Sequence, residues 1–162
     1  MAVMEWTEKL QLGLGPMDET HEEFVEDCNR LAAAPSSEAL LAELDVFIEH
    51  TIAHFDQENH WMELVGFPGC HKAEHDRVLA VCKDVRKRLV NGDVALTRQL
   101  IQELPVWFAN HVESMDAALA AYLASIDFDP ATGEIRNPPS AEEAEGACCT
   151  PPAQAAAASE AA

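Results

Sequence analysis

Four stretches of helical periodicity, bounded by residues that end a helix, dominate this sequence. Within each stretch, apolar side chains recur every three or four positions and form a single stripe. The bounding segments are LGLGP, PSS, GFPG and NGD, which contain strong helix-breaking residues. We therefore expect helices over residues 17 to about 33, 36 or 37 to 65, about 69 to 90, and 93 to about 126.

The same pattern predicts how these helices pack. No run alternates in the manner of a β-strand, and four helices joined by short breaks favour an up-down-up-down four-helix bundle. The predicted fold class is therefore all-α. We expect Ser36 or Ser37 to cap the second helix and Asp93 to cap the fourth. Pro105 should kink the fourth helix or divide it in two.

From residue 127 onward the composition changes. This segment is rich in proline, alanine and glutamate and nearly empty of large apolar residues. Because such a chain buries too little surface to offset the entropy of ordering, we expect it to be mostly disordered. The predicted organisation is a helical bundle over residues 1–126 and an acidic, Ala/Pro-rich C-terminal tail over residues 127–162, which offers a possible contact for a protein partner.

Charge and cysteine content limit the function classes. The net charge of -19, from 10 basic and 29 acidic residues, argues against nucleic-acid and anionic-membrane partners. No apolar run approaches the length of a membrane span, and the start lacks the pattern of a secretory signal, so a cytoplasmic location is expected. The cysteines have no spacing typical of a disulfide framework or a zinc finger, and Cys28, Cys70 and Cys82 are expected to be buried, inert thiols.

Seven polar side chains are assigned to the interior of the four predicted helices. Isolated charges or imidazoles in a bundle core are costly unless they are paired or bound to metal. Two His–His pairs have a spacing of four, at residues 50/54 and 71/75, whereas random placement predicts about 0.3 such pairs. A metal site is therefore favoured. Its candidate ligands are His21, His54, Glu58, His71, His75, His111 and Asp116.

A surface position for the HKAEH segment is the alternative to a buried metal site, but it would expose Leu79 and Cys82 too. The residue types of the candidate ligands also indicate which metal is bound. Imidazole suits zinc, copper, iron and nickel, and structural zinc needs four ligands, so seven groups fit two ions better than one. Paired iron is the natural candidate. A ferritin-like carboxylate site is disfavoured, because no glutamate stands three positions before any histidine.

Four segments carry a family resemblance. MDETH, HFDQE, GFPGCHKAEH and WFANHVESMD resemble, in this order, the successive signatures of the hemerythrin family. The pattern of His, HxxxE, HxxxH and HxxxxD spans residues 21 to 116, essentially the whole predicted bundle. The resemblance implies two iron ions bridged by an oxo or hydroxo group. It assigns His71, His75 and His111 to one iron, His21 and His54 to the other, and Glu58 and Asp116 to both.

The resemblance further implies a ligand pocket. The iron with two histidines would keep one vacant position, where dioxygen binds reversibly. Trp107, Phe108 and Val112 would wall this pocket, and a dry apolar wall favours reversible binding over turnover. His50 stands where the family often has tyrosine; it would be a hydrogen-bonding partner, a residue at the pocket mouth or a partly exposed bystander. Asn59 is expected not to affect the metal.

One spacing is selected by the resemblance alone. His111 and Asp116 are five residues apart, which places them about 140° apart around an ideal α-helix. Periodicity would therefore reject the pair. Side-chain reach or a local π-bulge would reconcile the two positions.

The expected function is oxygen transport, storage or delivery by a non-enzymatic protein, as a monomer or small homo-oligomer. Three alternatives use the same bundle. One is a sensor of oxygen, redox state or iron that signals through the tail. The second is a reductase of peroxide or nitric oxide, and the third is a store of iron or zinc.

Overall fold

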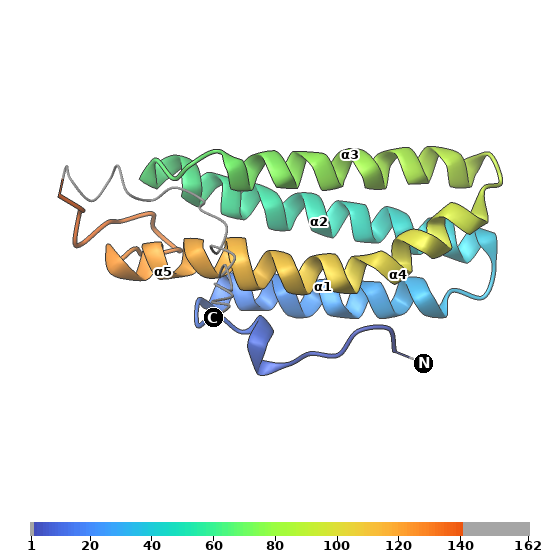
Figure 1. The fold of residues 1–162 in the computed structure, drawn as a ribbon, viewed down its shortest axis with the longest axis horizontal. Helices are drawn as coiled ribbons and strands as arrows, with labels where there is room; N and C mark the ends of the chain where they lie inside the picture. The colour runs from blue at the N-terminus through green and yellow to red at the C-terminus, as the bar shows by residue number, and fades with distance from the viewer. Residues whose placement is uncertain (1, 141–162) are drawn as a thin grey trace, which may run out of the picture.

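The computed structural model describes residues 2–140 and is built from helices (Figure 1). Figure 1 shows α1, α2, α3 and the line formed by α4 and α5 lying alongside one another as a four-helix bundle, which confirms the predicted all-α class. A short 3-10 helix precedes α1, and a π-helical turn joins α4 to α5. The elements are η1 (Glu8–Leu10), α1 (Gly15–Ala33), α2 (Ser37–Val65), α3 (Cys70–Val90), α4 (Val94–His111), η2 (Val112–Asp116) and α5 (Ala117–Ser125).

The helix ends follow the signals in the sequence. The Ser36 hydroxyl accepts a hydrogen bond from the Ala39 amide at 3.1 Å, and the Asp93 carboxylate accepts one from the Leu96 amide at 3.1 Å. Both side chains therefore satisfy amides of the first turn, as predicted. Gly66 ends α2 with a φ of 66°, a left-handed conformation in which glycine avoids the strain of a side chain.

Pro105 lies inside α4 without ending it. The helix is continuous from Val94 to His111, so the predicted division into two segments is wrong. Figure 1 shows α4 changing direction along its length, which agrees with the alternative prediction of a kink. Proline removes one backbone donor from the helix, but packing of α4 against α1 and α3 holds the two parts together.

The interior contains two apolar clusters. One includes Phe24 of α1, Phe55 of α2 and Phe108 of α4. The other includes Met17 of α1 and Trp61 of α2, together with Leu119 of α5. In α1, in α2 and along the line of α4 and α5, buried polar residues lie between the members of one apolar cluster and those of the other. The bundle therefore holds a polar layer between two apolar ones.

Residues 127–137 fold against the end of the bundle. Phe128 is only 7% exposed and belongs to the second apolar cluster, and it pairs with Ile135 in an isolated antiparallel bridge. The Asp129 amide donates to the Glu134 carbonyl at 2.8 Å, and the Asn137 amide donates to the Ile126 carbonyl at 2.9 Å. The predicted start of disorder at residue 127 is therefore too early. The remainder of the predicted tail, residues 141–162, lies outside the described residues.

The three cysteines within residues 2–140 lie in two environments. Cys28 and Cys82 are fully buried, and burial raises the pKa of the Cys82 thiol to about 12 and that of Cys28 still further. These two are the inert thiols that the sequence predicts. Cys70 is exposed at the first position of α3, so the prediction of burial is wrong there.

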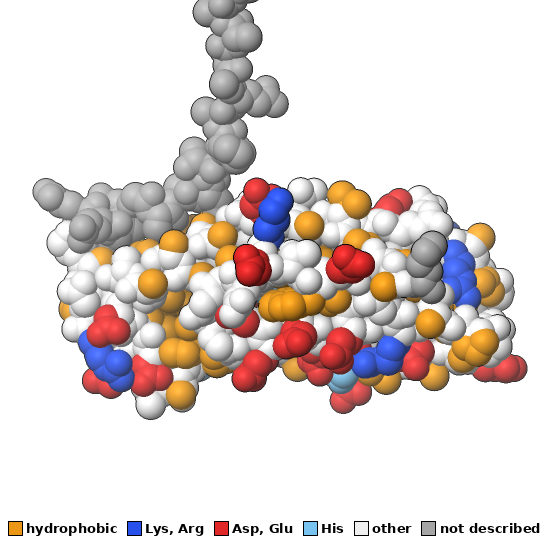
Figure 2. Space-filling view, turned by 90° about the horizontal axis from the view of Figure 1, so that it is seen from below, with side chains coloured by type: hydrophobic (Ala, Val, Ile, Leu, Met, Phe, Trp, Pro, Cys, Tyr) orange, Lys and Arg blue, Asp and Glu red, His pale blue; other side chains and the backbone are white. Residues whose placement is uncertain are grey.

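The surface agrees with the acidic composition. Figure 2 shows acidic side chains spread over the face seen there, with lysine and arginine in a few places. Within residues 2–140, none of the helices combines the length and the apolar character needed to cross a membrane.

Candidate metal centre

The structure brings all seven candidate ligands together in the polar layer. Each is at most 4% exposed, although five are histidines and two are acids. They form two groups that share Glu58, and within each group one ligand atom per residue lies within 4.8 Å of the others. The larger group contains Glu58, His71, His75, His111 and Asp116, and the smaller contains His21, His54 and Glu58. The alternative of a surface position for HKAEH is thereby excluded.

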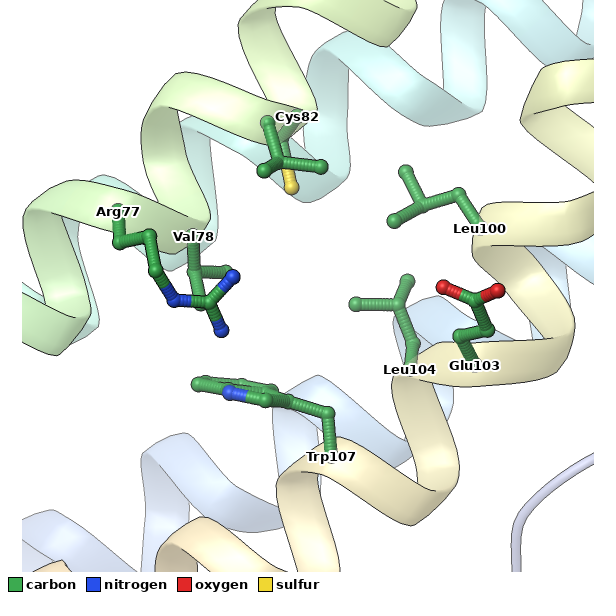
Figure 3. Close-up of a pocket in the computed structure, with 8 residues that line it drawn as sticks. Arg77, Val78, Cys82, Leu100, Glu103, Leu104 and Trp107 are labelled. Atoms are coloured by element: carbon green, nitrogen blue, oxygen red, sulfur yellow. The ribbon is translucent and has the colours of Figure 1, made fainter.

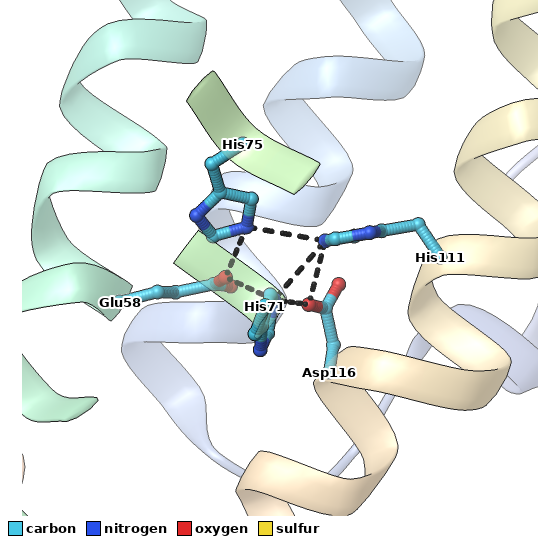
Figure 4. A group of neighbouring side chains, drawn as sticks. All are labelled: Glu58, His71, His75, His111 and Asp116. Atoms are coloured by element: carbon cyan, nitrogen blue, oxygen red, sulfur yellow. Dashed lines mark hydrogen bonds and ion pairs between the residues drawn. The ribbon is translucent and has the colours of Figure 1, made fainter. Parts of the chain in front are cut away.

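Three imidazoles converge in the larger group (Figure 4). Nε2 of His71 and Nε2 of His75 each lie 3.2 Å from Nε2 of His111. One oxygen of each acid joins them. Glu58 Oε2 lies 3.3 Å from His75 Nε2, and Asp116 Oδ1 lies 2.9 Å from His71 Nε2. Nitrogen and oxygen atoms from α2, α3, α4 and η2 thus face one small volume.

The other oxygen of each acid faces the remaining two histidines. Glu58 Oε1 lies 3.0 Å from His54 Nε2, and Asp116 Oδ2 lies 3.2 Å from His21 Nε2. Glu58 Oε1 is also 3.9 Å from His21 Nε2. Each carboxylate therefore directs one oxygen to the group of three histidines and one to the group of two. This arrangement suits two cations side by side, with the acids between them.

The π-helical turn explains how Asp116 reaches the site. In η2 the Ala117 amide bonds to the Val112 carbonyl, five residues earlier, instead of the usual four. The wider turn brings residues five apart toward the same face, so His111 and Asp116 both point inward (Figure 4). The sequence allowed two explanations of this spacing, longer side-chain reach or a π-bulge, and the structure contains the second.

The donor atoms of the cluster fit a bound cation. Nε2 of His21, Oε2 of Glu58 and both oxygens of Asp116 are buried and make no hydrogen bond within residues 2–140. Imidazole nitrogens that face one another with lone pairs repel, and buried carboxylates without donors are costly. A cation between them would remove both penalties. The residues present therefore fit a metal ion.

Two of the imidazoles are oriented by groups that the sequence reading missed. His21 Nδ1 lies 2.9 Å from the Leu10 carbonyl, and because a carbonyl only accepts, Nδ1 carries the proton. Its Nε2 is then free to be a ligand. His75 Nδ1 lies 3.0 Å from Asn59 Oδ1 in the same way. Asn59, which was expected not to affect the metal, thus contacts the ring of a candidate ligand. Neither periodicity nor spacing in the sequence predicts such a contact.

The electrostatics of the metal-free cluster are those of histidine–carboxylate pairs. Burial would lower the pKa of His21, but ion pairing with Asp116 and Glu58 outweighs it and raises the pKa to about 10. Burial likewise opposes ionisation of Asp116, yet His111, His21 and His71 hold its pKa well below the ordinary value. Burial lowers the pKa of His75 and so favours the neutral ring, which is the ligand form. A proton on Nε2 of His21 would therefore compete with a cation for that nitrogen.

Aromatic rings surround the cluster on the side of the first apolar cluster. Phe108 is fully buried, meets the His21 ring edge-on at 5.3 Å and stacks on Phe24 at 4.0 Å. Phe55 stacks on the ring of His75 at 3.9 Å. Phe24 and Phe55 were not among the predicted wall residues, because periodicity cannot separate core residues from pocket walls. The predicted wall residues Trp107 and Val112 are half-buried and fully buried, respectively.

His50 lies one turn before His54 at the edge of the bundle. Its side chain is 35% exposed, and Nδ1 lies 2.8 Å from Oδ2 of Asp27, which is buried and also paired with Arg30. A small hollow is lined by both His50 and His54. His50 is therefore a hydrogen-bonded residue close to the cluster. Its predicted place in a ligand pocket stays a prediction. His60, in contrast, is exposed, as expected.

Replacement of His50 by phenylalanine is expected to lower the free energy of unfolding by about 1–2 kcal/mol, because the buried Asp27 carboxylate loses a hydrogen-bond partner. Chemical denaturation measures the effect. The matched control is His60→Phe on the same helix, which is exposed and should change stability little. Equal effects of the two substitutions would contradict this interpretation.

The fold and the cluster together define a class: a four-helix bundle that binds metal through histidines and carboxylates in its core. Comparison with known proteins shows which family within this class the chain belongs to. The family model of the "Hemerythrin HHE cation binding domain" matches residues 13–123. The chain belongs to the hemerythrin family.

Individual relatives and solved structures support the assignment to this family. A bacteriohemerythrin of Ralstonia nicotianae is 47% identical over 126 residues, which cover 76% of this chain and 91% of the relative. A bacteriohemerythrin of Methylococcus capsulatus is 29% identical over 122 residues, which cover 72% and 93%. The crystal structure of a hemerythrin variant superposes with a TM-score of 0.68 at 28% identity and covers 76% of this chain and 99% of that one. The match of the family model leaves residues 1–12 and 124–162 uncovered.

Proposed function

We propose that the cluster binds two iron ions and that the protein binds dioxygen reversibly at one of them. His71, His75 and His111 would hold one iron, and His21 and His54 the other. Glu58 and Asp116 would bridge both, together with an oxo or hydroxo group. The orientation of the two acids supports the bridging roles, because each directs one oxygen to either group of histidines.

The unequal number of histidines is the observation that carries the proposed function. If both acids and a solvent-derived bridge were shared, three histidines would complete six ligands around one ion. Two histidines would give only five around the other, which would leave one position open to a small ligand. When bound, the iron pair supplies the two electrons that a reversible union with dioxygen requires.

The surrounding side chains favour binding over turnover. Phe24, Phe55 and Phe108 place apolar carbon against the histidine rings and keep bulk water from them. The Nδ1 proton of His21 is held by the Leu10 carbonyl and is not directed at the other candidate ligands. A dry site of this kind supplies protons slowly, and slow proton supply protects a reversible complex from decay.

Anaerobic loading with ferrous iron, followed by absorption spectra before and after oxygen, tests the proposed function. We expect about two irons per chain, a colourless reduced form, and a visible charge-transfer band that appears with oxygen and disappears under argon. Zinc-loaded protein is the control and should show no band. Continuous consumption of oxygen, peroxide or nitric oxide by the reduced protein would instead favour a reductase.

Replacement of Asn59 by alanine is expected to weaken metal binding about 10–100-fold, because residues that orient a ligand imidazole contribute that much in other sites. The fold should persist, since Asn59 is half-buried and small. Competition with a chelator measures the affinity. Asn110→Ala is the control, since Asn110 is exposed on α4. An unchanged affinity in Asn59→Ala would mean that the contact with His75 does not orient the ring.

A further inference from the structure

A cavity of about 100 Å³ lies between α3 and α4, outside the metal cluster. Val78, Val81 and Cys82 line it from α3, and Leu100, Leu104 and Trp107 line it from α4. Figure 3 shows these helices facing each other across the opening, with the side chains of Cys82, Leu100 and Leu104 directed into it. We call this space the α3–α4 cavity. None of the candidate metal ligands lines this cavity.

The lining of the α3–α4 cavity selects for small apolar molecules. Its walls are aliphatic carbon, an indole and the Cys82 thiol, which burial keeps in its neutral form. Two charged residues, Arg77 and Glu103, also line the cavity, and both are exposed to solvent. Water needs several polar partners to occupy a cavity, whereas apolar cavities of about 150 Å³ stay dry and bind benzene or xenon. Size and chemistry therefore suit a diatomic gas or a noble-gas atom.

Trp107 contacts both the cavity and the metal cluster. Trp107 lines the cavity, and its ring is stacked on that of His111 with centroids 4.8 Å apart and planes inclined by 23°. The centroid of the same indole lies 6.3 Å from those of the Phe24 and Phe55 rings, and the Phe55 ring in turn lies 5.3 Å from the His54 ring and 3.9 Å from the His75 ring. An apolar molecule in the cavity is thus next to the aromatic layer that covers the histidines.

The position of the indole is fixed by an ion pair at the surface. Trp107 Nε1 donates to Glu74 Oε1 at 2.8 Å, and Arg77 donates to both oxygens of Glu74, at 2.6 and 2.8 Å. The hydrogen bonds from Arg77, with that from Trp107, lower the pKa of Glu74 to about 2 despite partial burial. The acceptor therefore stays ionised at neutral pH. Glu74 is a positioning residue that keeps the inner wall of the cavity in place.

We propose that the α3–α4 cavity binds small apolar molecules and is the position that dioxygen occupies before it passes the Trp107 wall to the metal cluster. The step from cavity to cluster rests on the proposed function. Occupation of the cavity does not, because it depends only on the size and the apolar lining of the space. The two parts are therefore tested by separate measurements.

Xenon tests the cavity without reference to iron. Crystals of the full chain, pressurised with xenon, are expected to show xenon density between Val78, Leu104 and Trp107, with or without bound metal. Val81→Phe should abolish it, since Val81 is 40% exposed at the cavity and a ring there fills the space without disturbing the core. Val106→Phe is the matched control, because Val106 is 64% exposed on α4 and does not line the cavity. Absence of xenon from the unaltered protein would overturn the proposal.

Oxygen kinetics test the route. In iron-loaded Val81→Phe, the rates of oxygen association and dissociation are both expected to fall about tenfold with little change in affinity, since a blocked route alters rates and not the final complex. Val106→Phe should leave both rates unchanged, and Val81→Phe rates equal to those of the unaltered protein would overturn the route. If the iron-loaded protein forms no oxygen complex at all, the proposed function fails, and xenon occupancy alone then supports or overturns the cavity as a binding site.

Discussion

Replacing Asp116 with asparagine is expected to abolish the oxygen-dependent absorption band and to reduce iron content to one ion per chain or none. Asparagine keeps the shape of the side chain but removes its charge and one of its two oxygen donors. Those oxygens lie 2.9 Å from His71 Nε2 and 3.2 Å from His21 Nε2, so both groups of ligands are affected. Iron analysis after anaerobic loading and gel filtration measures the loss.

The control for this substitution is Asp76→Asn. Asp76 is an exposed residue of α3 that pairs with Lys72, and its replacement changes the net charge equally without contact to the cluster. Circular dichroism should show the same helical content in both variants. Retention of two irons and of the band in Asp116→Asn would remove the bridging role of this acid.

The metal-free protein is expected to lose stability as pH rises from about 6.5 to about 10. Although burial opposes it, pairing with Asp116 and Glu58 raises the pKa of His21 from 6.5 to about 10. A raised histidine pKa stabilises the fold fully below the unfolded-state value, and this contribution is lost as pH passes through the folded-state value. The loss should be on the order of 2–5 kcal/mol. Urea unfolding at intervals across this range measures it.

The variants for this experiment are His21→Gln and His60→Gln. His21→Gln should remove most of the dependence, whereas His60→Gln, at an exposed position of α2, should retain it. Iron-loaded protein should also lack the dependence, because a metal ion takes the place of the His21 proton. An unchanged slope in metal-free His21→Gln would show that another group carries the effect. At the acid end the sign reverses, because Asp116 and Glu58, whose pKa values are lowered, lose their contribution as they become protonated.

The sequence predicted the helices and their ends well because these are local properties. Apolar periodicity identified four rods, and the caps at Ser36 and Asp93 act within one turn of their own helices. The candidate ligands were found for a similar reason. Imidazoles and acids on apolar faces are costly in a core, and four such faces in one bundle have few ways to satisfy them together.

The sequence predicted least where distant residues decide the outcome. Phe128 packs onto Trp61, with ring centroids 6.5 Å apart, so a segment that looks disordered by composition is held by a partner 67 residues away. Pro105 does not break α4, since neighbouring helices hold both parts. Asn59 orients His75 through a contact between two helices. Neither the Phe128–Trp61 contact nor the Asn59–His75 contact has a sequence spacing that predicts it.

By itself, the sequence determined that four helices form and which of their residues are too polar for a plain core, because propensity, capping and amphipathicity act over a few residues. Only the tertiary structure decided that these side chains meet as three and two histidines around shared acids, and that a π-turn brings Asp116 to the same face as His111. The relative positions of separate helices, and a change of turn within one of them, depend on packing across the bundle, which no local pattern encodes.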